Sequence, residues 1–173
     1  MGADIYVKKV YDEHKAKTRP AFDAAVKARD EHAIKHRGKL FGGVPFNKTQ
    51  QKVHDRLQKV VEKTFDVMND TPAYFRDSYN ASNTLNRFGM SWWKDIKTNK
   101  KGEMSVAAAK EFRERVASAT MDVEQIRVDI ESGKWEKSAT LEKVIKYHNR
   151  KRENLLKLLD LSIELKTPVY CSV

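Results

Sequence analysis

The sequence predicts a mainly α-helical protein, a helical bundle of about four long helices with one short two-stranded pairing of the N- and C-terminal strands. Three observations lead to this prediction. Apolar residues recur at three- and four-residue spacing over most of the chain, glycine and proline separate these stretches, and only the two ends alternate like strands. The composition is that of a folded chain, since 34% of the 173 residues are charged and 40% are hydrophobic.

The strand-like segments lie at the two ends of the chain. Residues 4–8 and 168–173 are short and contain β-branched and aromatic residues. Two isolated strands are not stable in water, so we expect them to pair with each other and close the domain.

The first two helices are expected in the N-terminal half. Pro20 suits a first helical position, and the glycines from Gly38 onward end the first helix. Asn47 or Thr49 can cap the second helix. Its predicted inward stripe consists of Val53, Leu57, Val60, Thr64 and Val67.

The other two helices are expected in the C-terminal half. Apolar residues keep one helical spacing from about Ser105 to Gly133, which predicts a single third helix. The fourth runs from about Thr140 to Lys166 and is stopped by Pro168. We expect residues 1–173 to form a single helical domain.

The charge of the chain indicates an affinity for phosphate. The formal net charge is +10, which attracts nucleic acid, free nucleotides or an anionic membrane surface, although it also favours solubility alone. The single cysteine, Cys171, rules out an intramolecular disulfide and suits a reducing compartment. Because there is no signal-peptide pattern and no long apolar run, we expect a cytoplasmic protein with no membrane partner.

The last helix carries an anomaly in its apolar stripe. His148 and Arg152 interrupt a run of leucine and isoleucine. A cation that faces a core needs a partner, which is either internal, for example Asp77 or Glu62, or an anionic ligand. The run 146–152 also spreads positive charge around the helix, which is typical either of a solvated turn or of a phosphate-binding face.

Residues 74–94 combine aromatic, arginine and asparagine side chains. Aromatic rings can stack on a base, asparagine can bind its edge and arginine can hold phosphate. The alternative is that the aromatic rings fill the core and that asparagine and serine cap short helices. The predicted ligand-binding residues are Arg76, Tyr79, Asn83, Arg87, Trp93, His148 and Arg152.

Signatures of enzymes and of metal sites are weak. Gly42 and Gly43 lack the spacing of a phosphate-binding glycine loop, and no serine or cysteine stands in a nucleophile motif. His32 and His36 are four residues apart but lack the further ligands of a zinc site. We therefore expect no cofactor, no metal and no catalysis, with a site assembled from scattered residues as the open alternative.

Four strings carry a resemblance: GADIY at residues 2–6, YFRDSYN at 74–80, SWW at 91–93 and PVYCSV at 168–173. With these landmarks the chain resembles small proteins of bacteriophages and bacteria over nearly its whole length. In size and basicity it is also similar to phage counter-defence factors that sequester cyclic or ADP-ribose-type nucleotides. The resemblance implies an anti-defence role, in the host cytoplasm if the protein is viral, and assigns no function to any residue.

The leading hypothesis is a non-enzymatic protein that sequesters a phosphorylated nucleotide in a basic, aromatic-lined pocket. The arginines would hold phosphate, Tyr79 or Trp93 would stack on the base, and Asn83 would bind its edge. One alternative is a DNA- or RNA-binding accessory protein that uses the basic face of residues 146–152. Another is a protein–protein inhibitor of host defence, anchored by Trp92 and Trp93. A homo-oligomer that completes the pocket is compatible with each of these.

Overall fold

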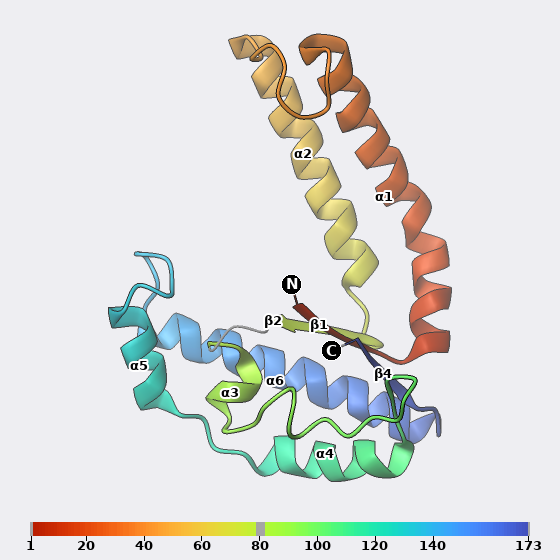
Figure 1. The fold of residues 1–173 in the computed structure, drawn as a ribbon, viewed down its shortest axis with the longest axis vertical. Helices are drawn as coiled ribbons and strands as arrows, with labels where there is room; N and C mark the ends of the chain where they lie inside the picture. Colours follow the sequence, from red (N-terminus) through yellow and green to blue (C-terminus); the bar gives the residue numbers. More distant parts are fainter. Residues whose placement is uncertain (1, 79–81, 173) are drawn as a thin grey trace. The chain divides into compact units, whose positions relative to one another are not determined.

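The computed structural model describes residues 2–78 and 82–172, and this part of the chain is mainly helical (Figure 1). The elements are β1 (Gly2–Tyr6), α1 (Lys8–Arg37), α2 (Lys48–Asn69), β2 (Tyr74–Ser78), α3 (Thr84–Arg87), β3 (Glu103–Met104), α4 (Val106–Ser118), α5 (Val123–Glu131), α6 (Leu141–Glu164) and β4 (Val169–Ser172). Among the described residues, no helix combines the length and the apolar character needed to cross a bilayer.

The chain divides into two compact units, which are described separately. The first consists of residues 1–9 and 72–173, and the second of residues 10–71. The expectation that the whole chain forms one domain stays a prediction.

The first unit contains a four-stranded antiparallel sheet with the order β2-β1-β4-β3. The predicted pairing of the two terminal strands is confirmed, since Ile5 lies opposite Cys171 and the rings of Tyr6 and Tyr170 stack at 5.8 Å. Cys171 is buried, and burial raises the pKa of its thiol to about 12, so it is an inert core residue.

The prediction of only two strands is wrong. β2 extends the sheet on the far side of β1, and β3 extends it beyond β4. The segment Tyr74–Ser78 does alternate, because Phe75 and Asp77 are buried while Arg76 is exposed. The buried carboxylate of Asp77 conceals this alternation in the sequence.

The core of the first unit lies around α6. Its buried residues repeat at helical spacing and include Val144, His148, Leu155 and Leu159. α4, α5 and α3 all contact α6, and Figure 1 shows α4 running beside it. The predicted bounds of this helix are confirmed: Thr140 is its N-cap, and its hydroxyl accepts a hydrogen bond from the Lys143 N–H.

The predicted third helix is two helices, so the predicted count of about four helices is too low. α4 ends at Ser118 and α5 begins at Val123, with Asp122 as its N-cap. The Asp122 carboxylate accepts a hydrogen bond from Gln125 N–H, and the Asp122 N–H donates to the Arg87 carbonyl at 2.7 Å. At this break a new helix therefore begins, and its N-cap residue forms a backbone hydrogen bond to α3.

The second unit is a helical hairpin of α1 and α2. α2 begins as predicted, with a capping box in which Asn47 and Gln50 bond each other's backbone N–H. α1 begins at Lys8, not at Pro20, which lies in its interior. Proline removes one N–H from the helical ladder, and the strong helix formers on both sides continue the helix through it.

The predicted inward stripe of α2 is wrong for its three valines, whereas its Leu57 and Thr64 are partly buried. Val53, Val60 and Val67 are 39%, 49% and 51% exposed, whereas Val61 and Met68 are buried. A hairpin of two helices buries only one narrow side of each, and that side is one residue further along α2.

Candidate functional site

His148 is the polar residue at the centre of the first unit. It is 1% exposed, and its Nδ1 lies 3.2 Å from the Thr84 hydroxyl on α3. The ring of Trp135 meets it edge-on at 5.6 Å. Burial, and after it the charge of Arg87, lower the pKa of His148 to about 4, while the charge of Asp129 opposes this shift. The imidazole is therefore neutral at physiological pH.

A buried ion-pair network lies beside His148. Nη2 of Arg87 lies 3.1 Å from Oδ2 of Asp129, and their side chains are only 6% and 1% exposed. The ammonium of Lys134 reaches the other oxygen of the same carboxylate at 2.9 Å. Arg87 is thus held in the interior, where the Asp129 carboxylate on α5 is a counter-charge of its guanidinium.

Arg152 caps the end of α4. Its two terminal nitrogens donate to the carbonyls of Ala117 and Ala119 at 2.9 and 3.0 Å, and its guanidinium lies over the Phe88 ring at 5.0 Å. The last carbonyls of a helix have no partner within the helix and carry its negative dipole end. The partner of Arg152 is therefore internal, but it is this backbone and not Asp77 or Glu62.

We expect Arg152→Met to lower the free energy of unfolding by about 2 kcal/mol, because two charge-assisted hydrogen bonds to backbone carbonyls are lost. Urea denaturation measures this loss. Arg150→Met, an exposed change two residues away, is the matched control and should leave stability within about 0.5 kcal/mol. Equal effects of the two variants would show that Arg152 does not cap α4.

Asp77 and Lys151 form a second polar pair under β2. The Asp77 carboxylate accepts from the N–H groups of Ser78 and Thr84, at 2.9 and 2.8 Å, and so fixes the start of α3. Burial raises the pKa of Asp77 and lowers that of Lys151, and each charge partly opposes the shift of the other. The Lys151 ammonium donates to the Arg76 carbonyl at 2.5 Å.

The described residues of the predicted site lie at different places in the first unit. Arg87, His148 and Arg152 are engaged inside the first unit, as described above. Asn83 is 4% exposed and caps α3, accepting from the Asn86 N–H at 2.8 Å. Arg76 lies on β2 with its side chain half exposed, 3.8 Å from Asp4.

Trp93 and Tyr79 are the two aromatic residues of the predicted site. Trp93 is 70% exposed in the loop after α3, and its backbone N–H donates to the Ser91 hydroxyl. Tyr79 lies outside the described residues. Its predicted stacking role stays a prediction.

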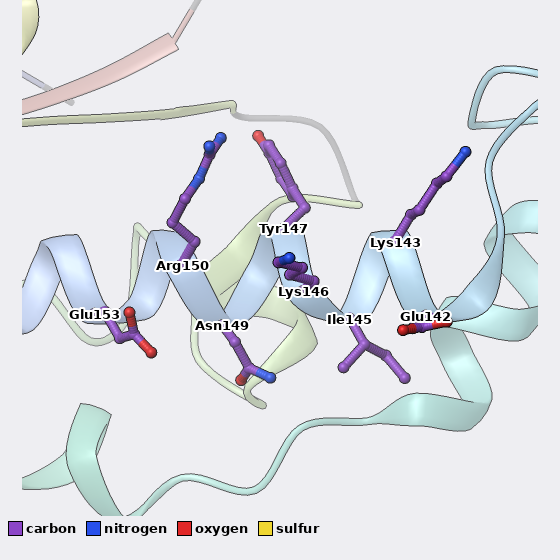
Figure 2. A pocket seen from close by; sticks show the side chains of 8 residues that line it. All are labelled: Glu142, Lys143, Ile145, Lys146, Tyr147, Asn149, Arg150 and Glu153. Atoms are coloured by element: carbon purple, nitrogen blue, oxygen red, sulfur yellow. The ribbon is translucent and has the colours of Figure 1, made fainter.

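The outward side of α6 carries the strongest candidate site. Lys143, Lys146, Tyr147 and Arg150 follow at spacings of three and four, which places them on one side of the helix. Figure 2 shows Lys143, Tyr147 and Arg150 extending in the same direction. We refer to these four residues as the α6 basic face.

The α6 basic face borders a concavity of about 680 Å³, which is open to solvent. All of its lining residues belong to α6: Glu142, Lys143, Ile145, Lys146, Tyr147, Asn149, Arg150 and Glu153 (Figure 2). A smaller hollow of about 350 Å³ lies next to it, with Trp135 and Lys143 among its lining residues. A surface made by one helix is shallow, so it suits an extended ligand better than an enclosed one.

The three cations of this face are available to a ligand. Lys143, Lys146 and Arg150 are exposed, and within the described part of the chain their side chains form no ion pair or hydrogen bond. Tyr147 is held by the rings of Trp135 and His148, at 5.5 and 5.2 Å, and burial raises the pKa of its hydroxyl. The face therefore combines exposed positive charges with one aromatic ring that is packed against its neighbours.

Metal binding has no support from the geometry. In residues 2–78 and 82–172, no group of three or more histidine, cysteine, aspartate or glutamate side chains is arranged to hold a metal ion. The rings of His32 and His36 do lie 4.7 Å apart, with His54 5.9 Å from His32.

Sequence reasoning found part of this site and missed part of it. It identified residues 146–152 as basic, but it assigned the ligand to His148 and Arg152, which point inward. It did not include Lys143, which lies one turn before Tyr147. The spacing of Lys143, Lys146 and Arg150, out of phase with the leucines, is the signal that identifies the outward side.

In comparisons with known proteins, the chain matches no family model, no curated protein and no solved structure.

Proposed function

We propose that this chain is a non-enzymatic nucleic-acid-binding protein that holds a phosphate backbone on the α6 basic face. The observation that carries the proposal is the difference between inward and outward cations on α6. Arg152 and Lys151 are used inside the fold, whereas the side chains of Lys143, Lys146 and Arg150 are exposed and form no ion pair or hydrogen bond with any residue that the structure describes. Phosphate contacts from such exposed cations supply most of the sequence-independent affinity for nucleic acid.

The shape of the face favours a strand over a single small molecule. The concavity is open and follows one helix, so a backbone can run along it and leave in either direction. Tyr147 can stack on a base that a single strand exposes. The net charge of +10 adds attraction over a longer range.

A second candidate function is the sequestration of a phosphorylated nucleotide. The volume of about 680 Å³ is that of a small-molecule site, and it favours this candidate. Retention of a nucleotide without turnover would lower its free concentration, which is the anti-defence role that the resemblance implies.

The salt dependence of binding tests the proposal. The logarithm of the association constant should fall linearly with the logarithm of salt concentration, and Lys146→Ala with Arg150→Ala should reduce the slope by about 1.8 on a duplex. Fluorescence anisotropy of a labelled oligonucleotide measures both quantities. The matched control is Lys100→Ala with Lys101→Ala, two exposed lysines in the same unit, which should leave the slope unchanged.

Thermal denaturation with a panel of ligands separates the two candidates. A small nucleotide at a hundred times its dissociation constant should stabilise its binding protein by about 2.7 kcal/mol. A selective shift with one cyclic or ADP-ribose-type nucleotide, and none with oligonucleotides, would replace nucleic-acid binding by sequestration. A ligand recovered in degraded form would show that the protein is an enzyme.

A further inference from the structure

The end of the α1–α2 hairpin holds half of the net charge of the chain. We call residues 35–56 the hairpin tip. They contain six basic residues and one acidic residue, a formal net charge of +5. The basic residues are Lys35, Arg37, Lys39, Lys48, Lys52 and Arg56.

The loop of the hairpin tip is closed tightly. The N–H of Gly38 donates to the Ile34 carbonyl at 2.9 Å, and the N–H of Val44 donates to the Arg37 carbonyl at 3.3 Å. Gly43 has a φ of +79°, and a Cβ there would lie 2.2 Å from the Arg37 oxygen, so only glycine fits. The loop therefore presents its side chains in a defined arrangement.

The apolar residues of this loop fall into two groups. Phe46 turns inward, with its ring 4.8 Å from that of His54 and 5.3 Å from that of His32, under the Arg37 guanidinium. Phe41 and Val44 turn outward and are 84% and 67% exposed. Burial of Phe46 holds the two helix ends together, whereas Phe41 and Val44 contribute nothing comparable to the fold.

The basic residues at the start of α2 are also not explained by folding. Lys48 is the first residue of the helix, at the positive end of the helix dipole, and α2 has no acidic residue in its first turn. Lys39, Lys48 and Lys52 are exposed. A positive charge at this position is unfavourable for the isolated helix and becomes favourable beside an anion.

We propose that the hairpin tip is a second contact surface for duplex nucleic acid, in which the cations hold phosphates and Phe41 and Val44 press against the bases from a groove. Apolar wedges flanked by cations are a common means of bending a duplex. The inference rests on the proposed function, because it assigns a second surface to the same class of partner, nucleic acid, and specifies that this partner is a duplex.

Charge selects this partner over two others. A second copy of the chain would bring one tip of +5 against another, which is repulsive. An anionic lipid surface could bind the tip, but it would not explain the α6 basic face. That face has cations, and none of its described residues is a large apolar side chain that is strongly exposed. Phosphate in a nucleic acid accounts for both surfaces.

Duplex binding by the full-length chain tests the inference, with a donor and an acceptor dye on the duplex ends to report bending. Phe41→Ser with Val44→Ser should weaken binding roughly tenfold and reduce the bend, with an unchanged salt slope. Lys39→Ala with Lys48→Ala should reduce the slope by about 1.8. The matched control, Val60→Ser with Val67→Ser, removes two exposed valines away from the tip and should bind and bend the duplex like the wild type.

Two results would overturn the inference. One is wild-type affinity, slope and bend in both tip variants. The other is that the Phe41 and Val44 variant no longer binds vesicles with one-third phosphatidylserine but still binds the duplex like the wild type. This result would assign the tip to a lipid surface. The Lys146 and Arg150 variant, measured in parallel, tests the proposed function alone. Failure of the proposed function can therefore be distinguished from failure of the inference about the tip.

Discussion

Asp129→Ala is expected to lower the free energy of unfolding by about 3–5 kcal/mol, the largest effect of any single substitution considered for this chain. Asp129 is 1% exposed and neutralises Arg87, which is itself 6% exposed. Without the carboxylate, the guanidinium loses the counter-charge that Asp129 supplies in the core, beside the neutral imidazole of His148. Urea denaturation followed by circular dichroism measures the loss.

A double variant distinguishes the effect of losing the charged partner of Arg87 from the effect of losing side-chain volume at Asp129. Replacing Arg87 by Met together with Asp129 by Leu removes both charges and retains apolar bulk, so it should recover most of the stability lost in Asp129→Ala. Lys134 is 44% exposed and can turn to solvent when its carboxylate is gone. A loss below about 1 kcal/mol for Asp129→Ala would show that Arg87 is solvated and that this network is not buried.

Acid is expected to destabilise the first unit through His148, by about 3 kcal/mol between neutral pH and pH 4. The pKa of this imidazole is about 4 in the folded protein, against 6.5 for a histidine in water. Because the folded-state pKa is the lower one, the unfolded chain takes up the proton first as the pH falls. The stability contributed by neutral His148 is therefore complete above pH 6.5 and is lost progressively down to pH 4.

His148→Gln tests this pH dependence, because glutamine can bond Thr84 and does not titrate in this range. Denaturation midpoints of the wild type and the variant should converge as the pH is lowered from 7 to 4, since the variant lacks the His148 contribution. Carboxylates that titrate near pH 4 affect both proteins equally. Parallel pH curves would mean that His148 is protonated inside the fold, where Asp129 would then balance it.

The sequence was sufficient to predict the elements whose ends have local signals. α2 and α6 begin at predicted caps, and α6 ends before Pro168 as expected. The two terminal strands pair as predicted because neither is stable without a partner. In these places the local preference and the tertiary structure agree.

The break between α4 and α5 could not be predicted from periodicity. The apolar spacing continues through Ala119 and Val123 without interruption, and the break depends on Arg152 and Arg87, which reach it from elsewhere in the chain. Interactions of this kind are tertiary, so a local pattern contains no trace of them. The short α3 is positioned by Asp77 in the same way.

The sequence predicted that the last helix carries the basic residues of the candidate site, but it did not predict which side of this helix faces the solvent. Sequence reasoning identified the cluster of positive charge on the last helix, and the structure has these residues on α6. It could not tell which side of the helix faces the core, because both sides carry cations. His148 and Arg152 are accommodated inside by Thr84 and by the end of α4, and this leaves Lys143, Lys146 and Arg150 to the solvent.

Charge reversal on the α6 basic face tests the central claim most directly. Lys146→Glu with Arg150→Glu should abolish oligonucleotide binding at physiological salt and leave the circular dichroism spectrum and the denaturation midpoint unchanged, since both residues are exposed. Lys100→Glu with Lys101→Glu changes the net charge equally and should retain most of the affinity. If both double variants lose affinity to the same extent, binding follows net charge alone, and α6 is not the site.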